Sequence, residues 1–231
     1  MQSQNPSRFL NLLLDDRLNA GIDQQSNASD AASFEVIPDA MARFSSAYPD
    51  VEVWLSELNS DEGLEAVRTR QLDLCVLHPP RIVDPDLNIE TIWLEPLVVV
   101  LPQKHRLADL QRISLGRLKS EPWVFWRREF ASRLYDEVIA ACTAAGFEPR
   151  VVQRTRRATT TVSMVASGIG VALLPITSAR LRIGGAIYRH IRSPSISVPV
   201  AFAWRQDRAD PLWANLMAVV RDSARRRKGR N

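Results

Sequence analysis

Short, nearly continuous apolar runs alternate with amphipathic segments from Ile37 onward, and this alternation constrains the fold more than any other feature of the sequence. The runs Leu72–Leu77 and Leu97–Leu101 are typical of strands that are covered on both faces, and Pro102 ends the second of them. Strands that alternate with helices need crossover connections, which build mostly parallel sheets flanked by helices. The sequence therefore predicts an α/β protein.

The alternation runs through the chain twice. Further strands are predicted at residues 51–55, 123–126, 150–153, 171–174, 186–188 and 198–204, and helices at residues 37–44, 64–67, 134–142, 159–167 and from 211 onward. Pro38 is expected in the first turn of its helix, Asp210 as an N-cap before Pro211, and Gly146 and Gly168 as left-handed helix ends. Two such series predict two lobes, with the strands near residues 97–102 and 198–204 crossing between them. A junction of this kind is the usual place for a small ligand.

Composition limits the class of protein and its cofactors. Hydrophobic residues make up 45% of the chain and no apolar run is long enough to span a membrane, so we expect a globular protein without a membrane partner. The amino terminus lacks the basic start, apolar core and cleavage site of a secretory signal, which favours a cytoplasmic location. Cys75 and Cys142 form no CxxC motif and are expected as buried free thiols. The histidines show no metal-ligand spacing, so we expect neither a metal nor another cofactor.

The carboxyl end of the chain is locally basic. Arg225, Arg226, Arg227, Lys228 and Arg230 account for much of the net charge of +4. A tail of this kind is compatible with contact to nucleic acid and also with a solvated, frayed end.

Several segments, by their order and spacing, resemble the effector-binding domain of LysR-type transcriptional regulators, especially those of aromatic-compound catabolism. They extend over about 190 residues, from Ala31 to Val220. The most specific segment is Thr161–Pro175, which is similar to the family's second-lobe helix and strand nearly residue for residue. The others are Ser33–Pro38, Arg43–Phe44, Tyr48–Val51, Leu72–Leu74, Leu97–Pro102, His105–Leu107, Leu134–Asp136 and Ala145–Pro149.

The resemblance implies two Rossmann-like lobes of the periplasmic-binding-protein type II fold, joined by two crossover strands, with a small effector between them. It places lobe I at residues 30–101 plus 203–231 and lobe II at residues 102–202. It also implies a homodimer or tetramer, because family members dimerise through these domains.

Residues 1–29 depart from the family. They match neither the winged helix-turn-helix nor the linker helix of such regulators, so contact with nucleic acid is expected only through a DNA-binding domain that is absent from this chain. The chain is then either part of a longer regulator or a stand-alone sensor. Leu18–Ile22 is a poor candidate for the first strand of lobe I, and the segment is otherwise irregular. Its apolar residues Phe9, Leu10, Leu13, Leu14 and Leu18 can form one short amphipathic helix.

Three helix starts are expected to converge on the junction between the lobes, near Phe34–Pro38, at Ser60, and at Thr159 and Thr160. Each start presents unpaired backbone N–H groups and the positive end of a helix dipole, and both suit a carboxylate. Ser60 fits an N-cap as well as an effector-binding hydroxyl, and by resemblance it matches a position where relatives place a hydroxyl against the effector carboxylate. Thr159 and Thr160 carry the same two interpretations. We therefore predict a small anionic effector, a carboxylate or an aromatic acid.

Lobe I departs from the family where relatives hold the effector. Ala31 stands at a position that is commonly serine, and Asp30 stands at a usual glycine. Because Asp30 brings a negative charge toward any carboxylate, the specificity is expected to differ from the muconate or benzoate type. Ser29 or Ser33 is a candidate substitute for the missing hydroxyl.

Side chains that follow two of the predicted strands complete the candidate site. Trp126 can pack against an aromatic ring of the effector. Arg127 or Arg128 can bind a carboxylate bidentately, although a pair of surface arginines that form ion pairs with neighbouring acidic residues explains them too. His78 is expected at the same junction, but lone histidines are more often surface or core residues. The predicted effector-binding set, with no catalytic residue, is Ala31, Ser33, Phe34, Ser60, His78, Trp126, Arg127, Arg128, Thr159 and Thr160.

Three functional classes share this architecture. In a regulatory sensor, effector binding shifts lobe closure and dimer geometry, which in a full regulator repositions the DNA-binding heads. A periplasmic-type solute-binding protein for a small anion needs export, and no signal is visible. An enzyme is disfavoured because the sequence has no P-loop, no GxSxG nucleophile, no GxGxxG after a strand and no metal cluster. The regulatory sensor is therefore the leading prediction.

Overall fold

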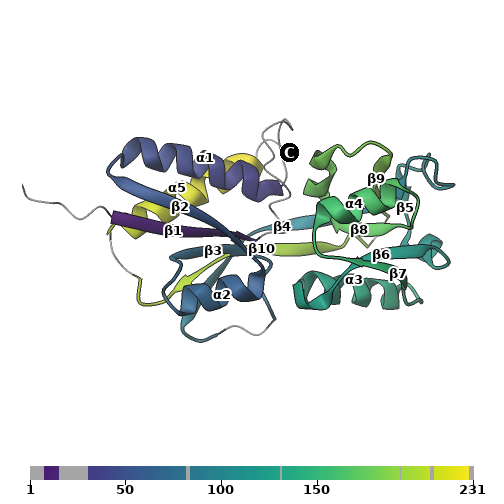
Figure 1. The fold of residues 1–231 in the computed structure, drawn as a ribbon, viewed down its shortest axis with the longest axis horizontal. Helices are drawn as coiled ribbons and strands as arrows, with labels where there is room; N and C mark the ends of the chain where they lie inside the picture. Colours follow the sequence, from purple (N-terminus) through teal and green to yellow (C-terminus); the bar gives the residue numbers. More distant parts are fainter. Residues whose placement is uncertain are drawn as a thin grey trace, which may run out of the picture.

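A computed structural model shows two lobes that lie side by side along the long axis of the molecule (Figure 1). The structure describes residues 8–15, 31–81, 84–130, 132–192, 194–208 and 211–228. One eight-stranded sheet runs through both lobes in the order β2-β1-β3-β10-β4-β9-β5, and β8 pairs with β4 beside this path. The prediction of a two-lobed α/β fold is confirmed.

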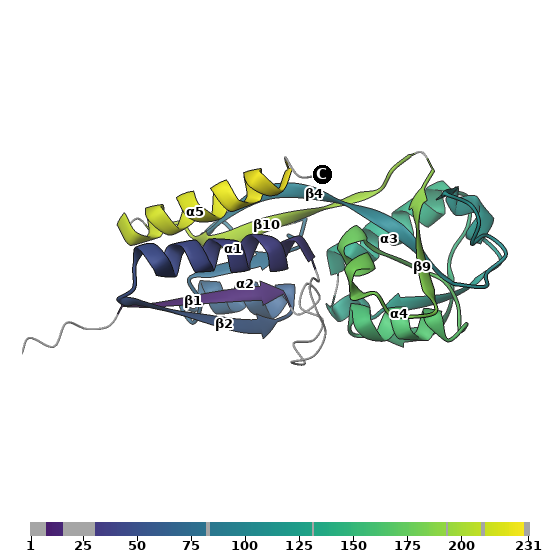
Figure 2. The same cartoon turned by 90° about the horizontal axis from the view of Figure 1, so that it is seen from above.

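Lobe I is a sheet covered by helices on both faces. Its elements are β1 (Arg8–Asp15), α1 (Ala31–Ala47), β2 (Val51–Leu58), α2 (Ser60–Arg68), β3 (Leu74–Leu77) and α5 (Pro211–Lys228). Helices α1 and α5 lie side by side on one face, and α2 covers the other (Figures 1 and 2). Phe44, Phe202 and Leu216 are fully buried beneath α1 and α5. Burial of such apolar side chains is the main source of stability for this lobe.

The amino-terminal segment contains a strand where the sequence suggested a short helix. β1 pairs in parallel with β2 on one side and with β3 on the other, so it has an interior place in the sheet. The segment Phe9–Leu14 is apolar at nearly every position, which is typical of a strand that is covered on both faces. The prediction of an amphipathic helix is therefore wrong for these residues. Leu18–Ile22, Ser29 and Asp30 lie outside the described residues.

Two long strands join the lobes. β4 (Leu87–Pro102) pairs with β10 (Ser197–Arg205) in lobe I and with β8 (Ala172–Pro175) and β9 (Ala186–Ile191) in lobe II. All three pairings are antiparallel, and the chain leaves lobe I along β4 and returns along β10. The expectation of mostly parallel sheets is therefore wrong for the crossing region, although β1–β2, β1–β3, β5–β9 and β6–β7 are parallel.

Lobe II has an aromatic core. Its remaining elements are β5 (Arg112–Ile113), η1 (Leu115–Leu118), β6 (Pro122–Trp126), η2 (Arg128–Phe130), α3 (Ser132–Ala144), β7 (Arg150–Thr155), α4 (Ala158–Ala166) and η3 (Ile176–Leu181). Trp123 and Phe125 are buried on β6, and their rings lie 6.4 Å apart. Phe125 also meets Tyr135 edge to face at 5.0 Å, the geometry that aromatic quadrupoles favour. This packing fixes β6 and α3 relative to each other.

Glycines end the helices of lobe II as predicted, whereas the start of α1 differs from the prediction. Gly146 after α3 and Gly168 after α4 both have φ +82°, the left-handed conformation of a helix end.

Helix α1 begins at Ala31, so Pro38 lies well inside the helix rather than in its first turn. Its ring costs one backbone hydrogen bond, and the burial of Ile37 and Phe44 on the same helix offsets that loss.

Both cysteines are buried and form no disulfide within the described residues, as predicted. Burial raises the pKa of the Cys142 thiol to about 12, so this group stays protonated and unreactive near neutral pH. None of the helices in the described ranges combines the length and the hydropathy of a membrane span.

Candidate functional site

The two lobes contact each other where the segment after β3 meets helix α3. Arg81, which follows β3 in lobe I, donates a hydrogen bond to Glu137 of α3 in lobe II at 3.1 Å. Arg128, just after β6, has a raised pKa, chiefly because it is hydrogen-bonded to Asp136, with smaller electrostatic contributions from Tyr135 and from Asp61 of α2. Helices α2, α3 and α4 therefore border the same boundary between the lobes (Figure 1).

Helix α4 starts at this boundary with an open end. The backbone N–H of Arg127 donates to the carbonyl of Thr155, the last residue of β7, at 3.2 Å, so the end of β7 lies beside the end of β6. The N-cap of α4 is Arg157, whose backbone is extended and whose side chain caps no N–H group. Thr159 is half-buried and Thr160 is exposed in the first turn. The first-turn N–H groups and two hydroxyls can therefore meet a ligand here.

The open end of α4 is held in place from the core of lobe II. Thr161, which is fully buried, shares a hydrogen bond with the hydroxyl of Thr155 at 2.6 Å and donates to the carbonyl of Arg157 at 3.0 Å. The Thr155 hydroxyl also lies 3.2 Å from the carbonyl of Phe125 on β6. Buried polar networks of this kind rigidify the segment that carries them. Two threonines thus position the helix start without using its free N–H groups.

Helix α2 has a closed start. Asn59 is its N-cap and accepts hydrogen bonds from the backbone N–H groups of Asp61 and Glu62, each at 3.0 Å. The Glu62 carboxylate in turn accepts from the N–H of Asn59 at 3.1 Å, which completes a capping box. Ser60 is therefore the first helical residue and is buried, so its interpretation as the N-cap is wrong. Its interpretation as an effector-binding hydroxyl stays a prediction.

Helix α1 contributes the third predicted start. Ala31 is its first residue, and Ser33 and Phe34 follow in the first turn. The side chains of residues 31–35 lie outside the described part of the structure. The three residues therefore remain predictions on the basis of their position.

Two predicted site residues are buried. His78, which is 2% exposed, follows β3, and its Nδ1 lies 2.9 Å from the carbonyl oxygen of Pro199 on β10. Trp126, at the end of β6, is equally buried and packs edge to face on Phe125 with ring centroids 5.6 Å apart. Both side chains are therefore packed beneath the surface at the boundary between the lobes.

The two predicted arginines have acidic partners on their own lobe. Arg127 lies 3.7 Å from Glu129, and Arg128 binds Asp136 through two hydrogen bonds of 2.9 and 3.0 Å. All four residues are at or near the surface, where such pairs contribute little stability. An effector carboxylate can therefore compete for either arginine.

Sequence reasoning missed two features of this region. The capping box Asn59-x-x-Glu62 has a recognisable spacing, but the N-cap predicted from the sequence lies one residue later, at Ser60. The pair Arg81–Glu137 joins residues 56 positions apart, and no local pattern signals it. Such contacts between lobes become visible only when the fold is known.

Comparison with known proteins gives a family match over most of the chain. Residues 27–225 match the model of the LysR substrate binding domain. The chain is 29% identical to the HTH-type transcriptional regulator AlsR of Bacillus subtilis, over 79% of this chain and 60% of that protein. It is 30% identical to the HTH-type transcriptional regulator IlvR of Caulobacter vibrioides, over 82% of this chain and 64% of that protein. The chain thus spans less than two thirds of the length of these relatives.

Solved structures share the fold. The BenM effector binding domain with its effector benzoate superposes with a TM-score of 0.79 at 17% identity, covering 96% of this chain and 94% of that one. The C-terminal domain of a probable LysR family transcriptional regulator from Rhodococcus sp. RHA1 gives 0.74 at 22% identity, covering 94% and 98%. At these identities the likeness shows the fold alone, which is the periplasmic-binding-protein type II fold that the sequence predicted.

Proposed function

Because this chain belongs to the LysR substrate binding domain family, we propose that it senses a small carboxylate at the boundary between its lobes and controls transcription as part of a LysR-type regulator. In this function the effector stabilises one arrangement of the lobes over another, and attached DNA-binding heads respond to the difference. The chain itself carries no catalytic role in the proposal.

The observation that carries the proposal is the uncapped start of α4. Its first-turn N–H groups meet no side chain of Arg157, whereas the comparable groups of α2 are bonded to Asn59. Uncapped N–H groups at the positive end of a helix favour an anion, and Thr159 and Thr160 add hydroxyl donors beside them. A carboxylate is the ligand chemistry that this arrangement fits best.

The remaining contacts are proposed from both lobes. Arg127 or Arg128 exchanges its acidic neighbour for the effector carboxylate, while the buried Trp126 and His78 shape the floor of the site. Ser60 and the start of α1, with Ala31, Ser33 and Phe34, are proposed to contact the effector from lobe I.

Thermal unfolding against a panel of aromatic and aliphatic carboxylates tests this function. A ligand present at 100 times its dissociation constant adds about 2.7 kcal/mol to the free energy of unfolding, which a melting curve resolves. One acid is expected to raise the melting temperature and to be recovered unchanged. If no acid in the panel raises it, the carboxylate proposal fails, and chemical turnover of the bound acid would contradict the assignment as a sensor.

We also propose that the chain forms a homodimer. Trp54 on β2 is 59% exposed and Val152 on β7 is 42% exposed, although both are large apolar side chains. β2 is the outer strand of the main sheet and β7 belongs to the two-stranded pair of lobe II, so the two side chains lie on different lobes. Exposed apolar residues on sheet edges favour association, and an antiparallel dimer would cover both.

Analytical ultracentrifugation tests the dimer. Trp54→Lys is expected to raise the dimer dissociation constant by at least about tenfold, because it removes a large aromatic contact and adds a charge. The matched control is Thr143→Lys, which adds the same single charge at an exposed position of α3, away from β2 and β7. A monomer in the wild type, or an equal effect of both substitutions, would contradict the proposed interface.

A further inference from the structure

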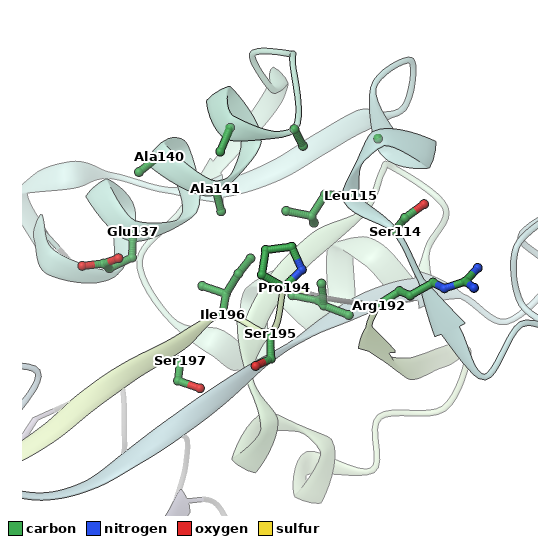
Figure 3. A pocket seen from close by; sticks show the side chains of 14 residues that line it. Ser114, Leu115, Glu137, Ala140, Ala141, Arg192, Pro194, Ser195, Ile196 and Ser197 are labelled. Atoms are coloured by element: carbon green, nitrogen blue, oxygen red, sulfur yellow. The ribbon is translucent and has the colours of Figure 1, made fainter.

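Lobe II contains a hollow that lies away from the start of α4. It is bounded by α3, by η1 and by the connection from β9 to β10, and its volume is about 570 Å³ (Figure 3). Cavities of this size are typical of sites for small organic ligands. None of the residues in the predicted effector-binding set lines it.

The walls of the hollow are largely apolar. Ala140, Ala141 and Ala144 present short side chains along one side of α3, and these leave space that longer side chains would fill. Leu115 and Ile196 face them from η1 and from the connection to β10 (Figure 3). The hollow therefore suits a ligand with an apolar body.

Two charged residues line the hollow, Glu137 and Arg192, and only the acidic one is paired among the described residues. Its single acidic group, Glu137, is paired with Arg81 at 3.1 Å and with Arg133 at 3.0 Å. Arg192 at the opposite end is exposed, and no carboxylate within the described ranges pairs with it (Figure 3). Because Glu137 is already neutralised by its two partners, Arg192 leaves a net attraction for an anion at its end of the hollow. The Ser114 hydroxyl, which makes no capping bond to η1, is a further donor at the rim.

The connection that forms one wall is fixed at both ends. The backbone N–H of Arg192 donates to the carbonyl of Ile113 at 2.8 Å, and the N–H of Leu97 on β4 donates to the carbonyl of Ile196 at 2.8 Å. The hollow is therefore held open by backbone hydrogen bonds rather than by mobile side chains. A site that is formed before binding loses less entropy when a ligand enters.

We propose that this hollow is a second small-molecule site, which takes an organic acid with an apolar body and acts on the contact between the lobes. The acid binds with its carboxylate toward Arg192 and Ser114 and its body against the alanines of α3. Glu137 lines the hollow and also forms the ion pair with Arg81 of lobe I, so the charge that the ligand meets depends on how the lobes meet. By linkage, the ligand then affects the contact between the lobes to the same extent.

Photo-cross-linking of the full chain locates the site. The probe is 4-benzoylbenzoate, an organic acid whose benzophenone body attacks nearby C–H bonds under ultraviolet light. Cross-links are expected in peptides that contain residues 137–145 and 191–197. Ala141→Trp fills the hollow and is expected to abolish them, while Thr143→Trp, which adds the same bulk at an exposed position of α3 outside the hollow, leaves them unchanged.

Three results would overturn the site. Cross-links confined to other peptides, such as those at the start of α4, place the probe elsewhere. Equal cross-linking in wild type and Ala141→Trp shows that the hollow is not used. Arg192→Glu, a surface substitution that leaves the core intact, is expected to weaken probe binding at least several-fold, and unchanged binding removes the role of the positive charge.

A second measurement tests the link to the lobe contact. Arg81→Ala leaves Glu137 with one cationic partner fewer, so it is expected to weaken binding of 4-benzoylbenzoate several-fold at low salt. Glu137→Gln removes the negative charge and is expected to strengthen binding. If neither substitution changes the affinity for the probe, the hollow is a binding site that does not act on the contact between the lobes. That result would contradict the second part of the proposal.

Discussion

The starts of α2 and α4 occupy comparable places in the two lobes but differ in how their N–H groups are satisfied. α2 carries its own cap, because Asn59 and Glu62 exchange hydrogen bonds with its first turn. α4 has Arg157 at the same position and no side-chain cap, and it is held instead by the buried threonine pair Thr155 and Thr161. A capped start is stable by itself, whereas an uncapped start that is fixed from within the core remains available to an anion.

The largest effect is expected from a cap introduced at α4. Arg157→Asp places a carboxylate where it accepts the first-turn N–H groups, so the free energy of unfolding is expected to rise by about 1 kcal/mol. The affinity for a carboxylate effector is expected to fall about 100-fold, because two hydrogen bonds of roughly 1.5 kcal/mol each are lost to the new cap. Urea unfolding and ligand titration measure the two quantities on the same sample.

Arg157→Ala is the control for the charge of arginine. It removes the cation without adding a cap, so its affinity loss is expected to be much smaller than that of Arg157→Asp. If both variants lose affinity equally, the N–H groups of α4 do not bind the effector and the comparison breaks down.

The next largest effect concerns the internal support of α4. Thr161→Val keeps the shape of the side chain but removes a buried hydroxyl that bonds Thr155 and the Arg157 carbonyl. The expected loss is about 2 kcal/mol of unfolding free energy, within the range for buried polar groups that lose a partner. Thr160→Val, at an exposed position of the same helix, is the matched substitution, and a similar loss there would show that the core network does not support the helix start.

Removal of the cap from α2 is expected to act on stability alone. Asn59→Ala deletes the acceptor of two backbone N–H groups and is expected to cost about 1 kcal/mol in urea unfolding. Effector affinity should stay within about twofold of wild type, because Asn59 bonds only the first turn of α2 and the anion is proposed to bind the first turn of α4. A large gain in effector affinity after loss of the cap would show that α2 competes for the same ligand.

The smallest effect is expected at the exposed hydroxyl of α4. Thr160→Val removes one donor at the boundary and is expected to lower effector affinity about fivefold, or roughly 1 kcal/mol. Unfolding free energy should not change measurably, because the side chain is exposed. Isothermal titration with the acid found in the thermal screen checks the affinity, and Ser163→Ala on the exposed side of the same helix serves as the reference.

Most of the fold follows from local patterns in the sequence. The apolar runs that became β3, β6 and β8 and the glycines that end α3 and α4 act over a few residues, so they are visible without the structure. The exception is β1, since a short apolar run fits a strand and a helix alike and only its parallel partners β2 and β3 decide between them. The antiparallel course of β4 and β10 likewise depends on where distant segments return.

The candidate site was less predictable than the fold. The residue types at the start of α4 could be identified, because threonines before an apolar helix exceed what a cap needs. Whether a helix start is capped, as in α2, or uncapped, as in α4, depends on which residue is the N-cap. The sequence pattern does not locate that residue to within one position. The hollow beside α3 has no sequence signal at all, since it arises from short side chains that face a connection about fifty residues further along the chain.

The packing of α5 on α1 has a consequence for synthesis on the ribosome. Ser223 of α5 donates to Asp39 of α1 across 184 positions, and β10 lies next to β3, so lobe I is closed by the last elements of the described chain. Lobe II is synthesised after the first part of lobe I and before β10 and α5. It can therefore fold while lobe I is still incomplete. At 5–20 residues per second, the apolar face of α1 stays uncovered for roughly ten to thirty seconds. Nascent chains that stall before α5 is synthesised are therefore expected to be the form that chaperones bind and proteases cleave.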